Sequence, residues 1–133
     1  MYTVESIMKS PVIGIDGEAT VREAMHLMRQ NRISGILVKA EGAEEYSGIM
    51  TKRDIITKVV AKGLDPDKVQ VKEVMHPLLI TVPPTCSLKE ASALMIQHNV
   101  RRIPIIDEGK IVGIVTDTDI FAAVEERGWG LEY

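Results

Sequence analysis

The 133-residue sequence contains one cysteine, no long hydrophobic run and no excess of positive charge. With Cys86 alone the chain forms no intramolecular disulfide, and a zinc site built from thiolates is disfavoured. No apolar run approaches the ~20 residues that a membrane-spanning helix requires, and the first residues lack a charged leader followed by an apolar stretch. We therefore expect a soluble, cytoplasmic protein without a membrane partner. The net charge of −3 argues against a general nucleic-acid binder, whose surface is normally basic.

The composition is that of a globular protein, with 45% hydrophobic and 26% charged residues. The length provides one ordinary core, or two small units that share a core. No nucleophile paired with a base is visible in the sequence. His26, His76 and His98 show no spacing typical of a metal site, and Cys86 has no histidine partner. We expect these four residues to pack or lie at the surface, and we expect no enzyme and no metal site.

One seven-residue stretch occurs twice, at residues 48–54 and 113–119. Both copies have glycine, two apolar residues, threonine, two variable residues and aspartate. Each follows a run of strand composition and precedes a helix-like apolar pattern. The chain therefore contains a duplicated unit. A shift of 67 residues places Val4 on Val71, Met8 on Met75, Glu23 on Glu90, Ala24 on Ala91, Leu27 on Leu94 and Met28 on Met95, and a shift of 65 then superposes the two seven-residue stretches.

Each copy predicts the same order of elements: a short helical turn, an extended piece, a helix, two strands and a final helix. Thr20 and Ser87, each followed three residues later by glutamate, predict capping boxes at the helix starts. A unit of about 60 residues is marginal alone, so we expect the two copies to pack together. The turns are expected at 4–8 and 71–75, the extended pieces at 11–15 and 78–82, and the strands at 36–38, 46–50, 103–106 and 111–115. The domain prediction is repeat 1 at 1–62, a linker at 63–70, repeat 2 at 71–127 and a tail at 128–133.

Two local signals refine the second copy. Residues 107–110 have the composition of a hairpin turn. Pro104 has no N–H to donate, so we expect it at a strand start or at a sheet edge.

These motifs, in this order and in two copies, resemble the cystathionine-β-synthase (CBS) domain, arranged as a tandem pair or Bateman module in a stand-alone protein. The resemblance implies a mixed α/β (α+β) fold of two β-α-β-β-α repeats, packed sheet to sheet with pseudo-two-fold symmetry. It also implies a homodimer, often disc-shaped. The ligands it implies are adenosine-containing regulators, namely AMP, ADP, ATP or S-adenosylmethionine, with no required cofactor.

The resemblance further implies that each ligand cleft combines the Thr and Asp of one repeat with residues of the other repeat. The first cleft would consist of Thr51, Lys52, Asp54, Leu78, Leu79, Ile80, Val100, Arg101 and Arg102. The second cleft would consist of Thr116, Thr118, Asp119, Met8, Ile13, Ile33, Ser34, Gly35 and Arg53.

The chemistry of these side chains agrees with such ligands. An ionised aspartate only accepts hydrogen bonds, and a ribose diol offers two adjacent donors. A threonine hydroxyl and the Arg101 and Arg102 guanidinium groups suit phosphate oxygens. We therefore expect the first cleft to hold the more highly phosphorylated ligand. The second cleft has Ser34 and Gly35 in place of the arginine pair, with Asp117 nearby, and Arg53 compensates only in part.

A simpler interpretation of the Thr-x-x-Asp pattern is a helix cap, which can coexist with ligand binding. The leading functional hypothesis is a non-catalytic module that senses adenine nucleotide, as in energy sensing, and signals in trans to an unknown protein. The alternatives are an oligomerisation scaffold with vestigial clefts and a nucleic-acid binder that uses Arg101, Arg102, Lys52 and Arg53. Trp129 and Tyr133 would either cover an apolar patch, dock on a partner subunit or belong to an unordered tail.

Overall fold

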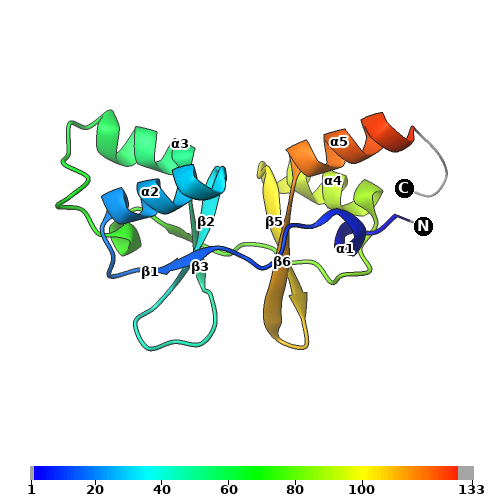
Figure 1. The fold of residues 1–133 in the computed structure, drawn as a ribbon, viewed down its shortest axis with the longest axis horizontal. Helices are drawn as coiled ribbons and strands as arrows, with labels where there is room; N and C mark the ends of the chain where they lie inside the picture. The colour runs from blue at the N-terminus through cyan, green and yellow to red at the C-terminus, as the bar shows by residue number, and fades with distance from the viewer. Residues whose placement is uncertain (1, 129–133) are drawn as a thin grey trace. The chain divides into compact units, whose positions relative to one another are not determined.

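The computed structural model describes residues 2–128 and divides into two compact units. Unit 1 contains Met1–Val12 and Ile80–Tyr133, and unit 2 contains Ile13–Leu79. Figure 1 shows the elements of both units. The division does not follow the order of the sequence repeats, because the start of the chain joins the second repeat and residues 71–79 join the first. Within the described residues, no helix is both long and apolar enough to cross a membrane.

Unit 2 is built on a four-stranded sheet in the order β1-β2-β3-β4. The pair β1·β2 is parallel, whereas β2·β3 and β3·β4 are antiparallel. The strands are β1 (Gly14–Asp16), β2 (Gly35–Lys39), β3 (Gly48–Thr51) and β4 (His76–Pro77), and the helices are α2 (Val21–Asn31), α3 (Lys52–Ile55), the π-helix η1 (Ile56–Val60) and the 3-10 helix η2 (Val71–Glu73). The expected strands at 36–38 and 46–50 are thus present, the second beginning two residues late.

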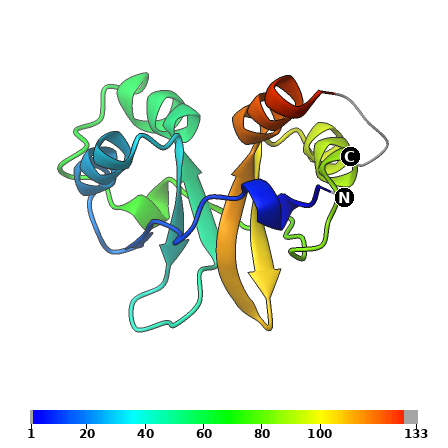
Figure 2. The ribbon, with the colours of Figure 1, turned by 45° about the vertical axis from the view of Figure 1, so that its right-hand side comes forward.

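Unit 1 is built on an antiparallel hairpin of β5 (Arg102–Asp107) and β6 (Lys110–Thr116), seen in Figure 2. Its helices are α1 (Val4–Ile7), α4 (Leu88–His98) and α5 (Asp117–Arg127). A parallel bridge between Val82 and Ile105 and an antiparallel bridge between Lys9 and Ile114 extend the hairpin on its two sides. These bridges take the places that β1 and β4 have in unit 2, so both units are mixed α/β arrangements of the same design.

The predicted hairpin turn at 107–110 is confirmed, with Glu108 at φ 50° and Gly109 at φ 78°. These are the left-handed angles of the tight turns that join right-twisted strands. Pro104 lies inside β5, and its carbonyl accepts from the Val82 N–H at 3.1 Å. The nitrogen of Pro104, which has no hydrogen to donate, faces the side of β5 away from β6. On that side β5 has only the single bridge to Val82 and no full strand, so the edge prediction is confirmed.

The extended piece expected at 78–82 makes only one bridge, at Val82, and no strand. Pro83 and Pro84 follow directly, and neither has an N–H that could continue a ladder. The strand of this region lies earlier, at β4, which the sequence did not predict.

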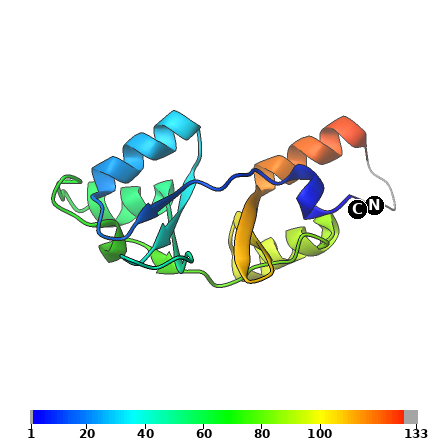
Figure 3. The same cartoon turned by 60° about the horizontal axis from the view of Figure 1, so that its bottom comes forward.

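Each unit is completed by a segment from the beginning of the other repeat. In unit 1 the Val4 N–H donates to the Cys86 carbonyl at 2.8 Å, and in unit 2 the Val71 N–H donates to the Ala19 carbonyl at 2.9 Å. Cys86 is the repeat equivalent of Ala19, so the two bonds are the same bond made twice. Figure 3 shows α1 lying close to α5, which belongs to the second repeat.

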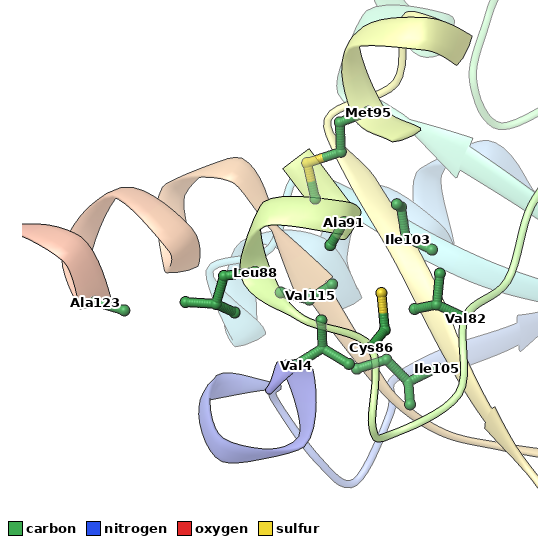
Figure 4. Close-up of a cluster of buried hydrophobic side chains, with 10 residues drawn as sticks. All are labelled: Val4, Val82, Cys86, Leu88, Ala91, Met95, Ile103, Ile105, Val115 and Ala123. Atoms are coloured by element: carbon green, nitrogen blue, oxygen red, sulfur yellow. The ribbon is translucent and has the colours of Figure 1, made fainter. Parts of the chain in front are cut away.

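The exchanged segments also supply core side chains. Val4 and Val71 are fully buried, and full burial of such a side chain is worth about 1.5–3 kcal/mol. Cys86 packs in the same cluster as Val4, as predicted (Figure 4). The core of unit 1 consists of Val4, Val82, Cys86, Leu88, Ala91, Met95, Ile103, Ile105, Val115 and Ala123. The core of unit 2 consists of Val21, Ala24, Met28, Ile36, Val38, Met50, Ile55, Val59, Val71 and Val74.

The N-caps predicted at Thr20 and Ser87 are present, but these two helix starts form only that half of the predicted capping box. The Thr20 hydroxyl accepts from the Glu23 N–H at 3.2 Å, and the Ser87 hydroxyl accepts from the Glu90 N–H at 3.0 Å. Both helices also end in the same way, at residues in the left-handed conformation, Arg32 and Asn99. Helices α2 and α4 are therefore copies of one capped unit.

The glycine that opens each seven-residue stretch makes room for a methionine of the exchanged segment. A Cβ at Gly113 would lie 2.3 Å from Met8 Sδ, and a Cβ at Gly48 would lie 2.7 Å from Met75 Sδ. Real atoms do not approach so closely. The glycines and the methionines recur together because each pair packs the exchanged segment against a strand.

Gly113→Ala should therefore lower the free energy of unfolding by about 1–3 kcal/mol, the usual cost of overpacking. The same substitution in a Met8→Ala background should cost less, because the clashing Met8 atoms are gone and only the Lys9 carbonyl oxygen remains close, at 3.2 Å. A double-mutant cycle by urea denaturation measures the coupling between the two positions. If Gly113→Ala costs the same in both backgrounds, the methionine contact is not the reason for the glycine.

Candidate ligand site

The two Thr-x-x-Asp pairs lie where a strand passes into a helix, Thr51 and Asp54 at β3–α3 and Thr116 and Asp119 at β6–α5. Both form complete capping boxes. The Thr51 N–H donates to Asp54 Oδ2 at 2.8 Å, and the Asp54 N–H donates to Thr51 Oγ1 at 3.1 Å. The corresponding distances in the second pair are 3.0 and 3.1 Å. The cap interpretation is confirmed for both copies.

The cap uses part of the hydrogen-bonding capacity expected for a ligand. The Thr51 hydroxyl also donates to Asp54 Oδ2, at 2.9 Å, so it is engaged inside the motif. The Asp54 side chain is 16% exposed and that of Asp119 is 11% exposed. Each carboxylate thus has one oxygen held by the cap and a second oxygen, Oδ1, that the cap does not use.

Basic side chains approach both carboxylates. Lys58 Nζ lies 3.8 Å from Asp54 Oδ1, and His76 Nε2 lies 3.3 Å from Asp54 Oδ2. In the other copy Lys9 Nζ lies 3.5 Å from Asp119 Oδ1. Each aspartate is therefore an acceptor whose negative charge is balanced by a cationic side chain within 4 Å.

Lys9 and His76 were not predicted as site residues. They are equivalent in the repeat, because each follows the methionine of an exchanged segment. The repeat alignment already shows that Lys9 and His76 are equivalent. It does not show that their partners are the aspartates, because those contacts form only in the folded chain. His26 and His98 are exposed, as expected.

Unit 2 contains one part of the residues predicted for the first cleft, namely Thr51, Lys52, Asp54, Leu78 and Leu79. The others, Ile80, Val100, Arg101 and Arg102, belong to unit 1. Within unit 1, the Asp117 N–H donates to the Arg101 carbonyl at 2.9 Å, and Arg102 pairs with Thr116 across the hairpin. The arginine pair thus neighbours the Thr116 motif, and its predicted combination with Thr51 and Asp54 stays a prediction.

The second predicted set shows the same local relation. Met8, Thr116, Thr118 and Asp119 belong to unit 1, and Ile13, Ile33, Ser34, Gly35 and Arg53 belong to unit 2. Within unit 2, the Lys52 N–H donates to the Ser34 carbonyl at 2.9 Å, and Gly35 pairs with Thr51. In both units the loop before the hairpin's first strand therefore lies beside that unit's own Thr-x-x-Asp motif.

The remaining candidates are the possible metal ligands, Cys86 and the two aromatic residues of the C-terminal tail. Among residues 2–128 no group of three or more His, Cys, Asp or Glu side chains is placed to hold a metal ion. Burial and the nearby Glu90 carboxylate raise the pKa of the Cys86 thiol to about 11, and Cys86 Sγ lies 3.7 Å from Glu90 Oε2. A thiol in this state is a poor nucleophile at neutral pH. Trp129 and Tyr133 lie outside the described residues.

Two CBS-type repeats, each with a capped Thr-x-x-Asp motif, define a CBS-pair protein, and comparison with known sequences agrees. The chain belongs to the CBS domain family, which it matches over residues 4–61 and 71–126. It is 38% identical over 120 residues to the CBS domain-containing protein YhcV of Bacillus subtilis, covering 90% of this chain and 84% of YhcV. Two archaeal relatives are longer, and the chain spans 64% and 60% of their length.

Solved structures show the same fold. An uncharacterized conserved protein from Pyrococcus horikoshii superposes with a TM-score of 0.85 at 31% identity, covering 96% of both chains. A hexameric CBS-CP12 protein from bloom-forming cyanobacteria also gives a TM-score of 0.85 at 32% identity, covering 98% of this chain and 73% of that one. The predicted family and the predicted mixed α/β fold are confirmed.

The state of Cys86 is testable with an aromatic disulfide reagent at pH 8. Because the thiolate is the reactive form, a pKa of about 11 should slow the native reaction by on the order of a hundredfold relative to the urea-unfolded chain. Glu90→Gln should speed the native reaction, since it removes a negative charge beside the sulfur. A native rate equal to the unfolded rate would contradict the assigned environment.

Proposed function

We propose that this protein is a non-catalytic regulatory module that binds adenosine-containing ligands, namely AMP, ADP, ATP or S-adenosylmethionine, at Asp54 and Asp119. The observation that carries the proposal is the pair of preorganised carboxylates, largely shielded from solvent and equivalent in the two repeats. Family membership supports the ligand class, because CBS domains generally bind adenosine ligands.

The carboxylates fit a ribose better than other parts of the ligand. An ionised carboxylate offers about four acceptor positions, and in both copies the cap uses Oδ2 rather than Oδ1. Oδ1 is turned toward a flexible lysine in both copies, at 3.8 Å for Asp54 and 3.5 Å for Asp119. A ribose diol could donate to Oδ1 without breaking the capping box, so binding need not disturb the helix start.

We also propose that the protein forms a homodimer through the α4–α5 face of unit 1. Ile96 on α4 is 83% exposed and Phe121 on α5 is 76% exposed. Between the helices runs an apolar groove lined by Leu88, Lys89, Ser92, Ala93, Ile96, Ile120 and Val124. Exposed large apolar side chains beside a groove are typical of an interaction surface. The hexameric state of the CBS-CP12 relative supports self-association in general.

Ligand binding is tested first by thermal melting with adenosine, AMP, ADP, ATP and S-adenosylmethionine. At a concentration about 100 times Kd, a ligand that binds only the folded state stabilises it by ~2.7 kcal/mol. Asp54→Asn combined with Asp119→Asn should abolish the stabilisation, since an amide places a donor where the ribose donates. Calorimetry then measures the affinity of each single variant.

Matched controls are Asp16→Asn in unit 2 and Asp107→Asn in unit 1, which remove the same charge at exposed positions. They should bind as the wild type does. Arg101→Ala should weaken ATP more than adenosine, whereas Lys110→Ala, an exposed cation of the same unit, should not. A flat response to all five ligands would favour the scaffold hypothesis and end the sensor proposal.

The dimer is tested by sedimentation equilibrium. Ile96→Glu combined with Phe121→Glu should shift the wild-type dimer to monomer, because two charges cannot be buried in an apolar interface. Leu64→Glu is the control, since Leu64 is also exposed but lies after η1 in unit 2. An unchanged mass of the double variant would show that copies do not associate through α4 and α5.

A further inference from the structure

One corner of unit 2 gathers exposed cations at the place where two junctions meet. Figure 1 shows α2 leading into β2 and β3 leading into α3 at the same end of the sheet. There the Lys52 N–H donates to the Ser34 carbonyl at 2.9 Å. Gly35 of β2 pairs with Thr51 of β3. The two junctions therefore lie side by side, and they present four exposed basic side chains, which form the basic corner: Arg29, Arg32, Lys52 and Arg53.

The cations of the basic corner have no carboxylate to balance them. Residues 24–40 and 46–53 contain no aspartate or glutamate. Within the described part of the chain none of the four side chains forms an ion pair, whereas Lys72 of the same unit pairs with Glu18 at 3.0 Å. Asp54, which follows in the chain, is engaged by its own capping box and by a lysine of η1. An anionic partner can therefore bind here without displacing an ion pair inside the protein.

Arg32 also occupies a backbone conformation that does not favour arginine. It ends α2 at φ 53° and ψ 46°, in the left-handed region. Glycine, and after it asparagine, is the ordinary residue at such a helix end, because most other side chains are strained there. Asn99 ends α4 in unit 1 at φ 52° and ψ 46°, so the other unit meets the same requirement with a favoured residue. Arg32 thus costs stability at this position, and strain of this kind points to a function of the side chain.

The second repeat shows that the fold does not require the charge of the basic corner. The equivalent positions hold no basic residue; they are Ile96, Asn99, Asp117 and Thr118. Unit 1 has its arginines in the loop, at Arg101 and Arg102, and there the acidic Asp117 lies beside them, its N–H donating to the Arg101 carbonyl at 2.9 Å. Both units form the same helix end and the same capping box, so the four cations of unit 2 are not needed for the shared fold.

We propose that the basic corner is a docking surface for an acidic segment of a partner protein. Guanidinium groups bind carboxylates through paired, charge-assisted hydrogen bonds, and three of the four cations are arginines. The inference goes beyond the proposed function, because it needs no ligand at Asp54 or Asp119. It assigns a chemistry to the protein that the module contacts: an exposed stretch of aspartate and glutamate.

A nucleic acid fits the basic corner less well than an acidic protein segment. Proteins that bind single strands stack bases on aromatic side chains. The one aromatic residue of unit 2 is Tyr46, which lies over Gly14 before the start of β3, whereas Lys52 follows the end of that strand. A duplex presents phosphates along its whole length, and the net charge of −3 opposes its approach to the rest of the surface. A carboxylate segment needs only the four cations of one corner.

Binding is tested by fluorescence anisotropy with a short labelled peptide rich in glutamate and with the same peptide carrying glutamine instead. The glutamate peptide should bind, and the glutamine peptide should not. Arg29→Gln combined with Arg32→Asn should raise the Kd of the glutamate peptide by about threefold or more, the usual scale for two exposed ion pairs.

The matched control is Lys62→Gln combined with Lys68→Gln, which removes two exposed cations of the same unit outside the basic corner. Its Kd should equal that of the wild type. An equal loss of affinity in both double variants would show that net charge alone attracts the peptide and would overturn the proposal. Failure of the glutamate peptide to bind the wild type would overturn it as well.

A second measurement tests the cost assigned to Arg32. Arg32→Asn should raise the urea midpoint of unfolding, and Asn99→Arg should lower it, because the two substitutions exchange favoured and unfavoured residues at equivalent helix ends. A lower midpoint in Arg32→Asn would show that the arginine contributes to the fold, and the reason for assigning it to a partner would be gone.

Further probes separate the docking surface from other uses of its charge. The Asp54→Asn, Asp119→Asn variant should bind the glutamate peptide as the wild type does, so failure of the proposed function leaves this inference standing. The response of the melting temperature to ATP should be the same in the wild type and in the Arg29→Gln, Arg32→Asn variant. A smaller ATP response in that variant would assign the corner to nucleotide. An RNA or DNA oligonucleotide that binds more tightly than the peptide and loses affinity in the same variant would assign it to nucleic acid, and either result would overturn the proposal.

Discussion

The whole structure depends on the exchange of one short segment between the two repeats. Val4 closes the core of unit 1, and Val71 closes the core of unit 2, each through a backbone bond to the residue directly before a helix N-cap. Val4 reaches Cys86 across most of the chain, yet the entropy of closing such a loop grows only slowly with its length. The free energy gained by burying one valine is comparable to the free-energy cost of closing the loop. The methionine that packs on Gly48 or Gly113 adds further stabilisation. Neither repeat, cut at its sequence boundary, would contain its own complete core.

The exchange also assigns the repeated seven-residue stretch two functions at once. Its glycine receives the methionine of the exchanged segment, and its aspartate receives the basic side chain that follows that methionine. The capping box holds this aspartate in place through the threonine, so the carboxylate is positioned before any ligand arrives. Under the proposed function, the carboxylate that contacts the exchanged segment is also the one that would bind the ligand, so a bound ligand would act on the segment as well.

Sequence reasoning predicted the features that local chemistry determines. The caps at Thr20 and Ser87, the hairpin turn at Glu108 and Gly109 and the edge position of Pro104 follow from a few neighbouring residues, and the structure confirms them. The repeat placed Val4 on Val71 but could not tell which repeat each valine packs against, because self-similarity is the same with or without exchange. His76 was missed for a related reason: its partner Asp54 is distant in sequence, and no spacing marks a pair formed only by folding. The π-helix η1 has no counterpart in α5, and no residue of η1 had indicated it.

The sequence placed the difference between the two sites in the loops, with Arg101 and Arg102 in one repeat against Ser34 and Gly35 in the other. The structure adds a second difference, at the carboxylates themselves. Lys58 accompanies Asp54, whereas the equivalent position in the other repeat is the buried Ala123. The hydrogen-bond distances are nearly the same in the two caps, so the position of the aspartates alone would not distinguish ligands. What differs is the charge beside each carboxylate. If these carboxylates bind the proposed ligands, the ion pairs of the free state would contribute to selectivity as directly as any contact to the ligand, because affinity is the difference between the bound and free states.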